Sequence, residues 1–257
     1  IGRGAMGEVY RAEQGTARRP VALKFLNPAV VGDAEMLERF FREAQVASTL
    51  KSPHVVQMLG SGRADDGSPF IAMELLRGMD LADRLREAKR LELPEVTELV
   101  SQVGDALAAA DRAGIVHRDI KPQNLFAVDD SPRRTWKVLD FGVSKMRELT
   151  SQLTQGAIIG TPSYMSPEQA RGLDVDHRSD VFSLGVIAYR CLTGRPAFTG
   201  PDSVITVYNV VHLQPARPLD LAPHLGEDVE RVLALVLAKD RERRFSSSTM
   251  FAAALID

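Results

Sequence analysis

The sequence predicts an α+β protein with two lobes, a small strand-rich lobe over residues 1–77 and a larger helical lobe over residues 78–257. The main observation is that strand-like segments give way to helical periodicity near Arg77 and Gly78. The second is the composition, because 44% hydrophobic and 26% charged residues over 257 positions suffice for one large core or two smaller ones. A cleft between two lobes is a common ligand site.

The first lobe is predicted to hold two pairs of short strands around one helix. The strands cover residues 1–11, 21–25, 55–61 and 70–75. The helix is indicated by apolar residues that recur every three or four positions and stop before Pro53, namely Met36, Leu37, Phe40, Phe41, Ala44, Ala47 and Leu50.

The second lobe is predicted to begin with a long helix that has Pro94 in its first turn and ends at Gly114. Its buried face comprises Val96, Leu99, Val100, Val103, Ala106, Leu107 and Ala110. Extended segments near 115–117, 125–128 and 136–139 predict a small sheet. Residues 180–192 and 229–238 are the strongest later helices.

Charge and cysteine content restrict the partners and the compartment. Thirty-two basic and 34 acidic residues give a net charge of −2, so we expect neither nucleic acid nor an anionic membrane as the main partner. A single cysteine, Cys191, excludes an internal disulfide and fits a reducing compartment. No signal peptide or run of 18 apolar residues occurs, so we expect a cytoplasmic domain, which a parent protein could still anchor to a membrane. The start at Ile1, inside the first motif, is typical of an excerpt from a longer protein.

Gly2, Gly4 and Gly7 form a G-x-G-x-x-G pattern that lets the backbone approach phosphate oxygens. Alone the pattern is weak, since a glycine-rich hairpin also fits it. A dinucleotide-binding fold would need a helix directly afterwards, whereas residues 8–11 continue as a strand.

Lys24 ends an apolar strand, and Glu43 lies nineteen residues later on the amphipathic helix. A lone lysine in a strand is more often a surface residue. If the helix packs on the sheet, the two could pair, and the ammonium could then hold phosphate groups.

Residues 117–124, His-Arg-Asp-Ile-Lys-Pro-Gln-Asn, place six polar or ionisable side chains in eight positions, which no core requires. Here Asp119 can accept the proton of an attacking hydroxyl, Lys121 can neutralise a phosphoryl group, and Asn124 can bind Mg²⁺. Asp140, with Phe141 and Gly142, places a second oxygen ligand at the end of a strand.

Together these motifs resemble those of eukaryote-type serine/threonine protein kinases. Residues 117–124 match the H-R-D-x-K-x-x-N loop, and the glycine pattern, Lys24 and Asp140 follow the family order. Residues 160–169 look like the G-T-x-x-Y-x-x-P-E-Q segment of the bacterial branch. Asp180 resembles an aspartate that braces the catalytic loop, and Arg244 an arginine that pairs with Glu168.

The resemblance implies a bilobal protein-kinase fold and the transfer of phosphate from ATP, with Mg²⁺ or in its place Mn²⁺, to serine or threonine in proteins during signal transduction. Lys121 favours serine and threonine over tyrosine. The implied catalytic residues are Asp119 as base, Lys121, Lys24, Glu43 and Thr161. The implied metal ligands are Asn124 and Asp140. The implied ATP-binding residues are Ile1, Gly2, Gly4, Gly7, Val9, Ala22, Lys24, Met73, Glu74, Leu76 and Leu125.

Arg118 beside Asp119 implies control by a phosphate on the segment 141–168. Thr154 is the first choice, with Thr150 and Ser151 as alternatives. Such autophosphorylation can proceed in trans through self-association. Relatives often carry a second threonine where this chain has Gln155 and Gly156, which puts double phosphorylation in doubt.

Two other functions compete with this interpretation. A pseudokinase scaffold usually lacks the lysine, the base or a metal ligand, and this chain has all of them. A small-molecule kinase of the aminoglycoside phosphotransferase type usually lacks Arg118 and the Pro-Glu segment at 167–168, both of which are present.

Overall fold

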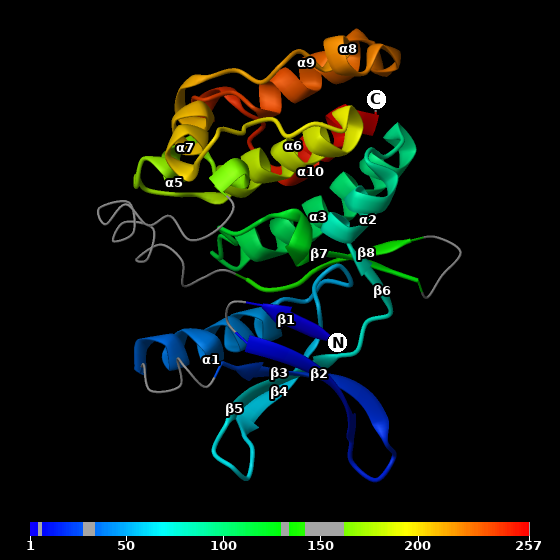
Figure 1. Cartoon of the computed structure of the whole chain (residues 1–257), viewed down its shortest axis with the longest axis vertical. Coiled ribbons are helices and arrows are strands. Elements are labelled where there is room, and N and C mark those ends of the chain that lie inside the picture. The colour runs from blue at the N-terminus through cyan, green and yellow to red at the C-terminus, as the bar shows by residue number, and fades with distance from the viewer. Residues whose placement is uncertain (5–6, 28–33, 130–133, 142–161, 257) are drawn as a thin grey trace.

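The computed structural model describes residues 1–4, 7–27, 34–129, 134–141 and 162–256. Its N-terminal part is an antiparallel five-stranded sheet in the order β1-β2-β3-β5-β4 (Figure 1). The strands are β1 (Gly2–Gly4), β2 (Gly7–Gln14), β3 (Arg19–Leu26), β4 (Met58–Arg63) and β5 (Pro69–Glu74).

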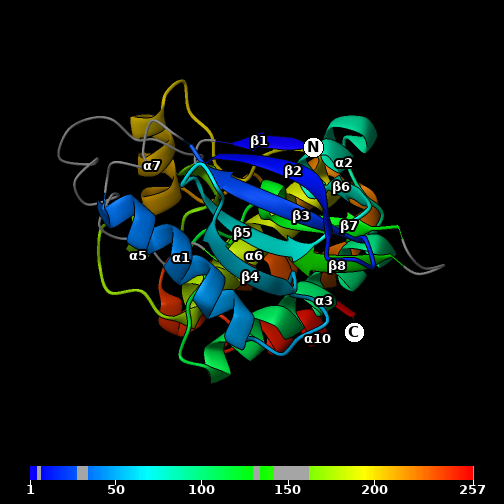
Figure 2. The ribbon, with the colours of Figure 1, turned by 90° about the horizontal axis from the view of Figure 1, so that it is seen from below.

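One helix, α1 (Ala34–Thr49), packs against this sheet. Its apolar stripe supplies Phe40 and Ala44, which are buried together with Leu26 and Ile71 of the sheet. Figure 2 shows α1 running past β4 and β5. Burial of this stripe stabilises the helix where its isolated turns would be marginal.

A second sheet begins directly after the first one. Strand β5 ends at Glu74, and β6 (Gly78–Asp80) pairs with β7 (Leu125–Val128), which in turn pairs with β8 (Thr135–Val138). Gly78 has φ +138°, and a Cβ there would lie 1.9 Å from the carbonyl oxygen of Ala127. Only glycine fits this close approach of β6 to β7.

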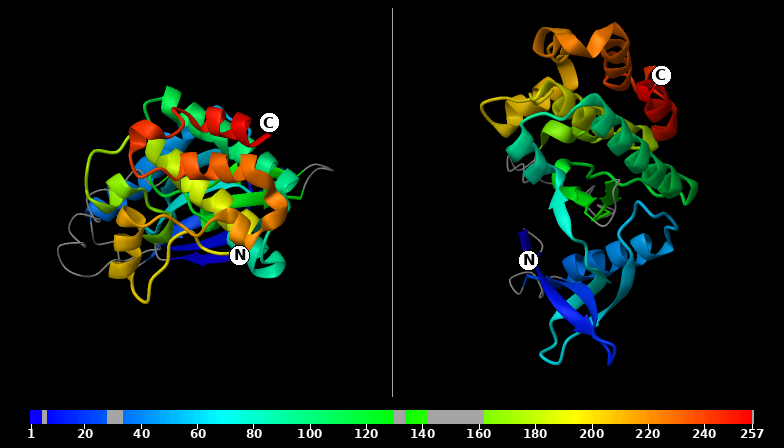
Figure 3. Two further views of the ribbon diagram at one scale, coloured as in Figure 1. Left: turned by 90° about the horizontal axis from the view of Figure 1, so that it is seen from above. Right: turned by 90° about the vertical axis from the view of Figure 1, so that its right-hand side faces the viewer.

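Helices make up most of the remaining chain, and Figure 3 shows them stacked beyond the small sheet. The α-helices are α2 (Leu81–Ala88), α3 (Leu93–Arg112), α5 (Pro167–Ala170), α6 (His177–Thr193), α7 (Ser203–His212), α8 (Pro218–Leu221), α9 (Gly226–Val236) and α10 (Ser248–Ile256). Short 3₁₀ turns are η2 (Pro122–Asn124), η3 (Pro162–Tyr164), η4 (Pro223–Leu225) and η5 (Arg241–Arg243). Helices α3 and α6 contact each other at the centre of the main core.

The predicted architecture is confirmed, with a sheet-rich N-terminal region and a helical C-terminal region. All seven residues predicted for the buried face of the long helix are buried in α3. The sequence predicts the small sheet without β6, because the three residues of this strand show no alternation of polar and apolar side chains. Residues 115–117 form no strand, because the backbone N–H of His117 binds a side chain instead. The lobe boundary at residues 77 and 78 stays a prediction.

Candidate active site

In the segment after α3, the side chains of Lys121 and Asn124 both contact the carboxylate of Asp119. The Lys121 ammonium lies 2.9 Å from Oδ2 of Asp119. The Asn124 amide donates to the same oxygen at 3.0 Å and to the Asp119 carbonyl oxygen at 2.8 Å. Asn124 is held in this position by the 3₁₀ turn η2, and its side chain is buried. The structure thus brings these three predicted residues together, and their catalytic and metal-binding roles stay predictions.

Asp180 of α6 fixes the backbone of this segment by two hydrogen bonds. Its two carboxylate oxygens accept hydrogen bonds from the backbone N–H of His117 at 2.7 Å and of Arg118 at 2.8 Å. Arg118 has φ +66°, a conformation that costs free energy for a residue with a side chain. Burial raises the pKa of the Asp180 carboxyl to about 7, whereas the two N–H groups and Arg118 favour its charged form.

Replacing Asp180 by asparagine should therefore destabilise the fold and the catalytic segment. An amide offers a single acceptor oxygen, so one of the two backbone N–H groups would lose its partner in a buried site. We expect a loss of about 1–3 kcal/mol in the free energy of unfolding, measured by urea denaturation. Asp105→Asn, on the exposed side of α3, is the control. Equal stability of the two variants would contradict this role of Asp180.

A second ion pair joins the N-terminal sheet to the segment after β8. Nζ of Lys24, on β3, lies 2.7 Å from Oδ2 of Asp140. Lys24 is buried, whereas 44% of the Asp140 side chain remains accessible. Burial raises the pKa of Asp140, but the Lys24 ammonium outweighs this effect and holds the pKa below its usual value. Asp140 is therefore a charged and accessible carboxylate.

Asn124 and Asp140 suit a hard divalent cation such as Mg²⁺. Because the amide nitrogen of Asn124 donates to Asp119, its oxygen remains as the ligand atom. Asp140 adds a carboxylate oxygen, and a magnesium ion of this kind completes its coordination with water and phosphate oxygens. No cluster of three or more His, Cys, Asp or Glu side chains suited to a metal occurs within the described residues.

The predicted glycines lie at the turn between β1 and β2, where Gly4 pairs with Gly7 and Gly2 with Val9. A Cβ on Gly7 would lie 1.8 Å from the carbonyl oxygen of Phe25 on β3. Gly7 is thus required by the packing of β2 against β3, whatever else it does. A Cβ on Gly2 would meet only Val9, at 3.8 Å.

The residues predicted to surround adenine come from both sheets. Ala22 pairs with Met73 between β3 and β5, and Glu74 ends β5. Leu125 begins β7 and is fully buried, and Leu76 lies in the connection to β6. Ile1 is exposed, and its backbone nitrogen donates to the Val9 carbonyl oxygen at 2.9 Å.

Several predicted residues lie outside the described part of the structure. The backbone of Glu43 belongs to α1, but its side chain is not described, so its pairing with Lys24 stays a prediction. Residues 142–161, which include Thr161 and the candidate phosphorylation sites Thr150, Ser151 and Thr154, also lie outside the described ranges.

The short helix α5 is attached to both the catalytic segment and the segment between η5 and α10. Glu168 forms a two-fold ion pair with Arg244, with distances of 2.7 and 2.9 Å, and both side chains are buried. Gln169 donates to the Arg118 carbonyl oxygen at 2.9 Å. The Glu168–Arg244 pair agrees with the prediction, whereas the sequence alone gave no reason to assign the Gln169 contact.

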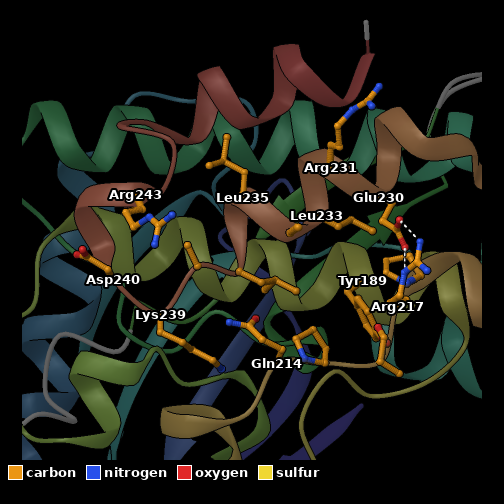
Figure 4. Close-up of a pocket in the computed structure, with 16 residues that line it drawn as sticks. Tyr189, Gln214, Arg217, Glu230, Arg231, Leu233, Leu235, Lys239, Asp240 and Arg243 are labelled. Carbon is orange, nitrogen blue, oxygen red and sulfur yellow. Dashed lines mark hydrogen bonds and ion pairs between the residues drawn. The ribbon is translucent and has the colours of Figure 1, made fainter.

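A separate cavity of about 820 Å³ lies among α6, α9 and residues 214–218 (Figure 4). Tyr189, Leu233 and Leu235 contribute apolar surface, and Arg217 pairs with Glu230 at its edge. None of the predicted catalytic, metal-binding or ATP-binding residues lines it.

Comparison with known proteins decides the family. The chain matches the protein kinase domain family over residues 1–256. It belongs to that family.

Similar proteins include the serine/threonine-protein kinase pkn3 of Myxococcus xanthus, at 40% identity over 99% of this chain and 48% of that protein. Serine/threonine-protein kinase PknB of Mycobacterium tuberculosis is 36% identical over 100% of this chain and 41% of its own length. The chain thus spans less than half the length of these relatives.

A solved structure supports the fold as well. The Mycobacterium tuberculosis PknI kinase domain superposes with a TM-score of 0.77 and 31% identity, covering 100% of this chain and 92% of that one. The described residues contain no helix both long and apolar enough to cross a membrane.

Proposed function

We propose that this kinase domain transfers the γ-phosphoryl group of MgATP to serine and threonine hydroxyls of proteins, in the cytoplasm and as part of signal transduction. The observation that carries the proposal is the meeting of Asp119, Lys121 and Asn124 at one carboxylate, with Lys24 and Asp140 in contact across the two sheets. The named relatives support the choice of serine and threonine.

In this reaction Asp119 orients the substrate hydroxyl and takes its proton. The hydroxyl oxygen bonds to the γ-phosphorus while the bond from that phosphorus to the β–γ bridging oxygen breaks, which leaves ADP. Lys121, held beside Asp119, places its ammonium where the transferred phosphoryl group carries negative charge.

Lys24 would hold the α- and β-phosphates, and its burial limits competition from water. A magnesium ion held by Asn124 and Asp140 would supply charge neutralisation at the phosphate oxygens. The backbone around Gly2, Gly4 and Gly7 would cover the phosphates. Glu43 would position Lys24. Thr161 would form a hydrogen bond near Asp119, the proposed base.

Autophosphorylation of residues 141–168 is part of the proposal, with Thr154 as the preferred site and Thr150 and Ser151 as alternatives. Arg118 supports it, because its buried Nε has no hydrogen-bond partner within the described residues. A phosphate would provide such a partner. The reaction between two copies of the domain requires only transient self-association.

The test is incubation of the purified domain with Mg²⁺ and γ-labelled ATP, followed by mapping of phosphorylated residues by mass spectrometry. We expect phosphate on Thr154 or its neighbours in the wild type, and about a hundredfold less or lower still in an Asp119→Asn variant. Absence of phosphate on 141–168 during active phosphorylation of a protein substrate would contradict the autophosphorylation, while leaving the transfer reaction itself intact.

A further inference from the structure

Two ion pairs of opposite polarity connect the N-terminal sheet to strand β8 and its end. Lys24 on β3 supplies the cation to Asp140, two residues beyond β8. Glu74 at the end of β5 supplies the anion to Lys137 within β8, at 2.6 Å between Nζ and Oε1. Lys24 and Glu74 lie on adjacent strands, since Glu74 pairs with Val21 of β3. Lys137 and Asp140 are three residues apart.

The Glu74 carboxylate is held from two directions. The same oxygen that receives Lys137 also accepts the backbone N–H of Gln57 at 2.7 Å, and the Glu74 N–H donates to the Gln57 carbonyl oxygen at 2.9 Å. The accessible fractions of the Lys137 and Glu74 side chains are 15% and 22%. Partial burial weakens solvent screening, so this pair should contribute more than an exposed ion pair does.

The segment just before Gln57 is itself hydrogen-bonded to β8. The backbone N–H of Val138 donates to the His54 carbonyl oxygen at 2.8 Å, and that of Val56 to the Val138 carbonyl oxygen at 3.0 Å. A ring nitrogen of His54 lies 3.1 Å from the Trp136 carbonyl oxygen. Glu74 therefore joins β8 both directly, through Lys137, and indirectly, through Gln57 and the segment that precedes it.

The two ion pairs differ in what they would do when nucleotide binds. If the proposed function holds, Lys24 and Asp140 both bind ligand groups, so their mutual contact is exchanged for contacts with phosphate and metal. Lys137 has no such task, and its contact with Glu74 lies immediately before the connection 75–77 between the sheets. The Glu74–Lys137 pair can therefore keep β8 in place when the contact between Lys24 and Asp140 is broken.

We propose that Glu74 and Lys137 form a strut that positions β8, and with it Asp140, against the N-terminal sheet, and so raises the affinity for MgATP. Their side chains position the site through Asp140 and the connection 75–77, whereas the contact with adenine predicted for Glu74 uses its backbone, which Glu74→Gln leaves in place. This inference rests on the proposed function, because it assigns Asp140 to the nucleotide site.

The experiment compares wild type with Lys137→Met, Glu74→Gln and the double variant, using calorimetric titration of MgATP together with kcat and KM. We expect Lys137→Met to raise Kd and KM for MgATP about tenfold, with kcat at saturating MgATP within about twofold of wild type. The Kd of the double variant for MgATP should be no higher than that of the weaker-binding single variant, because all three variants lose the same Glu74–Lys137 interaction. Lys137→Arg should restore most of the affinity.

Arg231→Met, which breaks an exposed ion pair with Asp228, is the matched control and should leave Kd unchanged. Folding of each variant is checked by thermal unfolding without nucleotide. An unchanged or lower Kd in folded Lys137→Met would overturn the strut. Calorimetry measures the affinity without turnover, so MgATP binding with no phosphate transfer by the wild type would count against the proposed function and not against the strut.

Discussion

Replacing Asp119 by asparagine should lower kcat for phosphate transfer to protein by about 10²–10⁴-fold, the usual contribution of a general base. The amide can still accept a hydrogen bond from Lys121 and occupy the same volume, but it cannot take the proton of the attacking hydroxyl. The change removes the chemical function of the side chain and keeps its place between Lys121 and Asn124.

The control is the affinity for MgATP, which should stay close to that of the wild type, because the proposed phosphate and metal contacts come mainly from Lys24, Asn124 and Asp140. Initial rates on a protein substrate at saturating MgATP measure the effect. A variant that keeps more than half of the wild-type kcat would show that another group accepts the proton.

Replacing Glu168 by glutamine should destabilise the domain by about 3–5 kcal/mol, which is the usual cost of leaving one member of a buried ion pair without its partner. The Arg244 side chain has no accessible surface, and its guanidinium also donates to the carbonyl oxygens of Ala238 and Lys239. These contacts hold the cation in place after its carboxylate is removed. Chemical denaturation with urea measures the loss.

The destabilisation by Glu168→Gln should depend on pH. Burial raises the pKa of Glu168, but the hydrogen bonds and charge of Arg244 outweigh it, so the folded-state pKa lies below the ordinary value of 4.5. A carboxyl group of this kind contributes stability above pH 4.5 and loses it as the pH falls through the folded-state pKa. The difference in unfolding free energy between wild type and variant should therefore be constant near neutrality and shrink below pH 4.5. A difference that grew on acidification would contradict the pairing.

The double variant Glu168→Gln with Arg244→Met separates the ion pair from its surroundings. If the single variant is destabilised because a buried cation has lost its partner, removing that cation as well should recover part of the stability. A double variant as destabilised as the sum of both single changes would show that the two residues act independently.

Contacts within short stretches of sequence were predictable, and contacts between distant stretches mostly were not. The spacing of Asp119, Lys121 and Asn124 places them in one loop, where proximity follows from chain connectivity alone. The pairing of Glu168 with Arg244, 76 positions apart, was expected only from resemblance to a family. Nothing in the sequence suggests the Glu74–Lys137 contact, because the partners are 63 positions apart and no periodicity relates them.

Secondary structure is predictable where a pattern repeats along the chain, and it is not where a short strand depends on a distant partner. Helix α3 is twenty residues long and repeats its apolar stripe from Val96 to Ala110, which is enough to identify a helical period. Strand β6 has only three residues, Gly-Met-Asp, and exists because β7 provides a partner. The roles of Glu43, Thr161 and the candidate phosphorylation sites stay predictions.

The most direct test of the central claim is phosphoamino-acid analysis after incubation of the domain with Mg²⁺, γ-labelled ATP and a protein substrate that offers serine, threonine and tyrosine. We expect label on phosphoserine and phosphothreonine, none on phosphotyrosine, and about a hundredfold less label or lower still with Asp119→Asn. Label found mainly on phosphotyrosine, or label of equal intensity with Asp119→Asn, would contradict the proposed serine/threonine kinase activity.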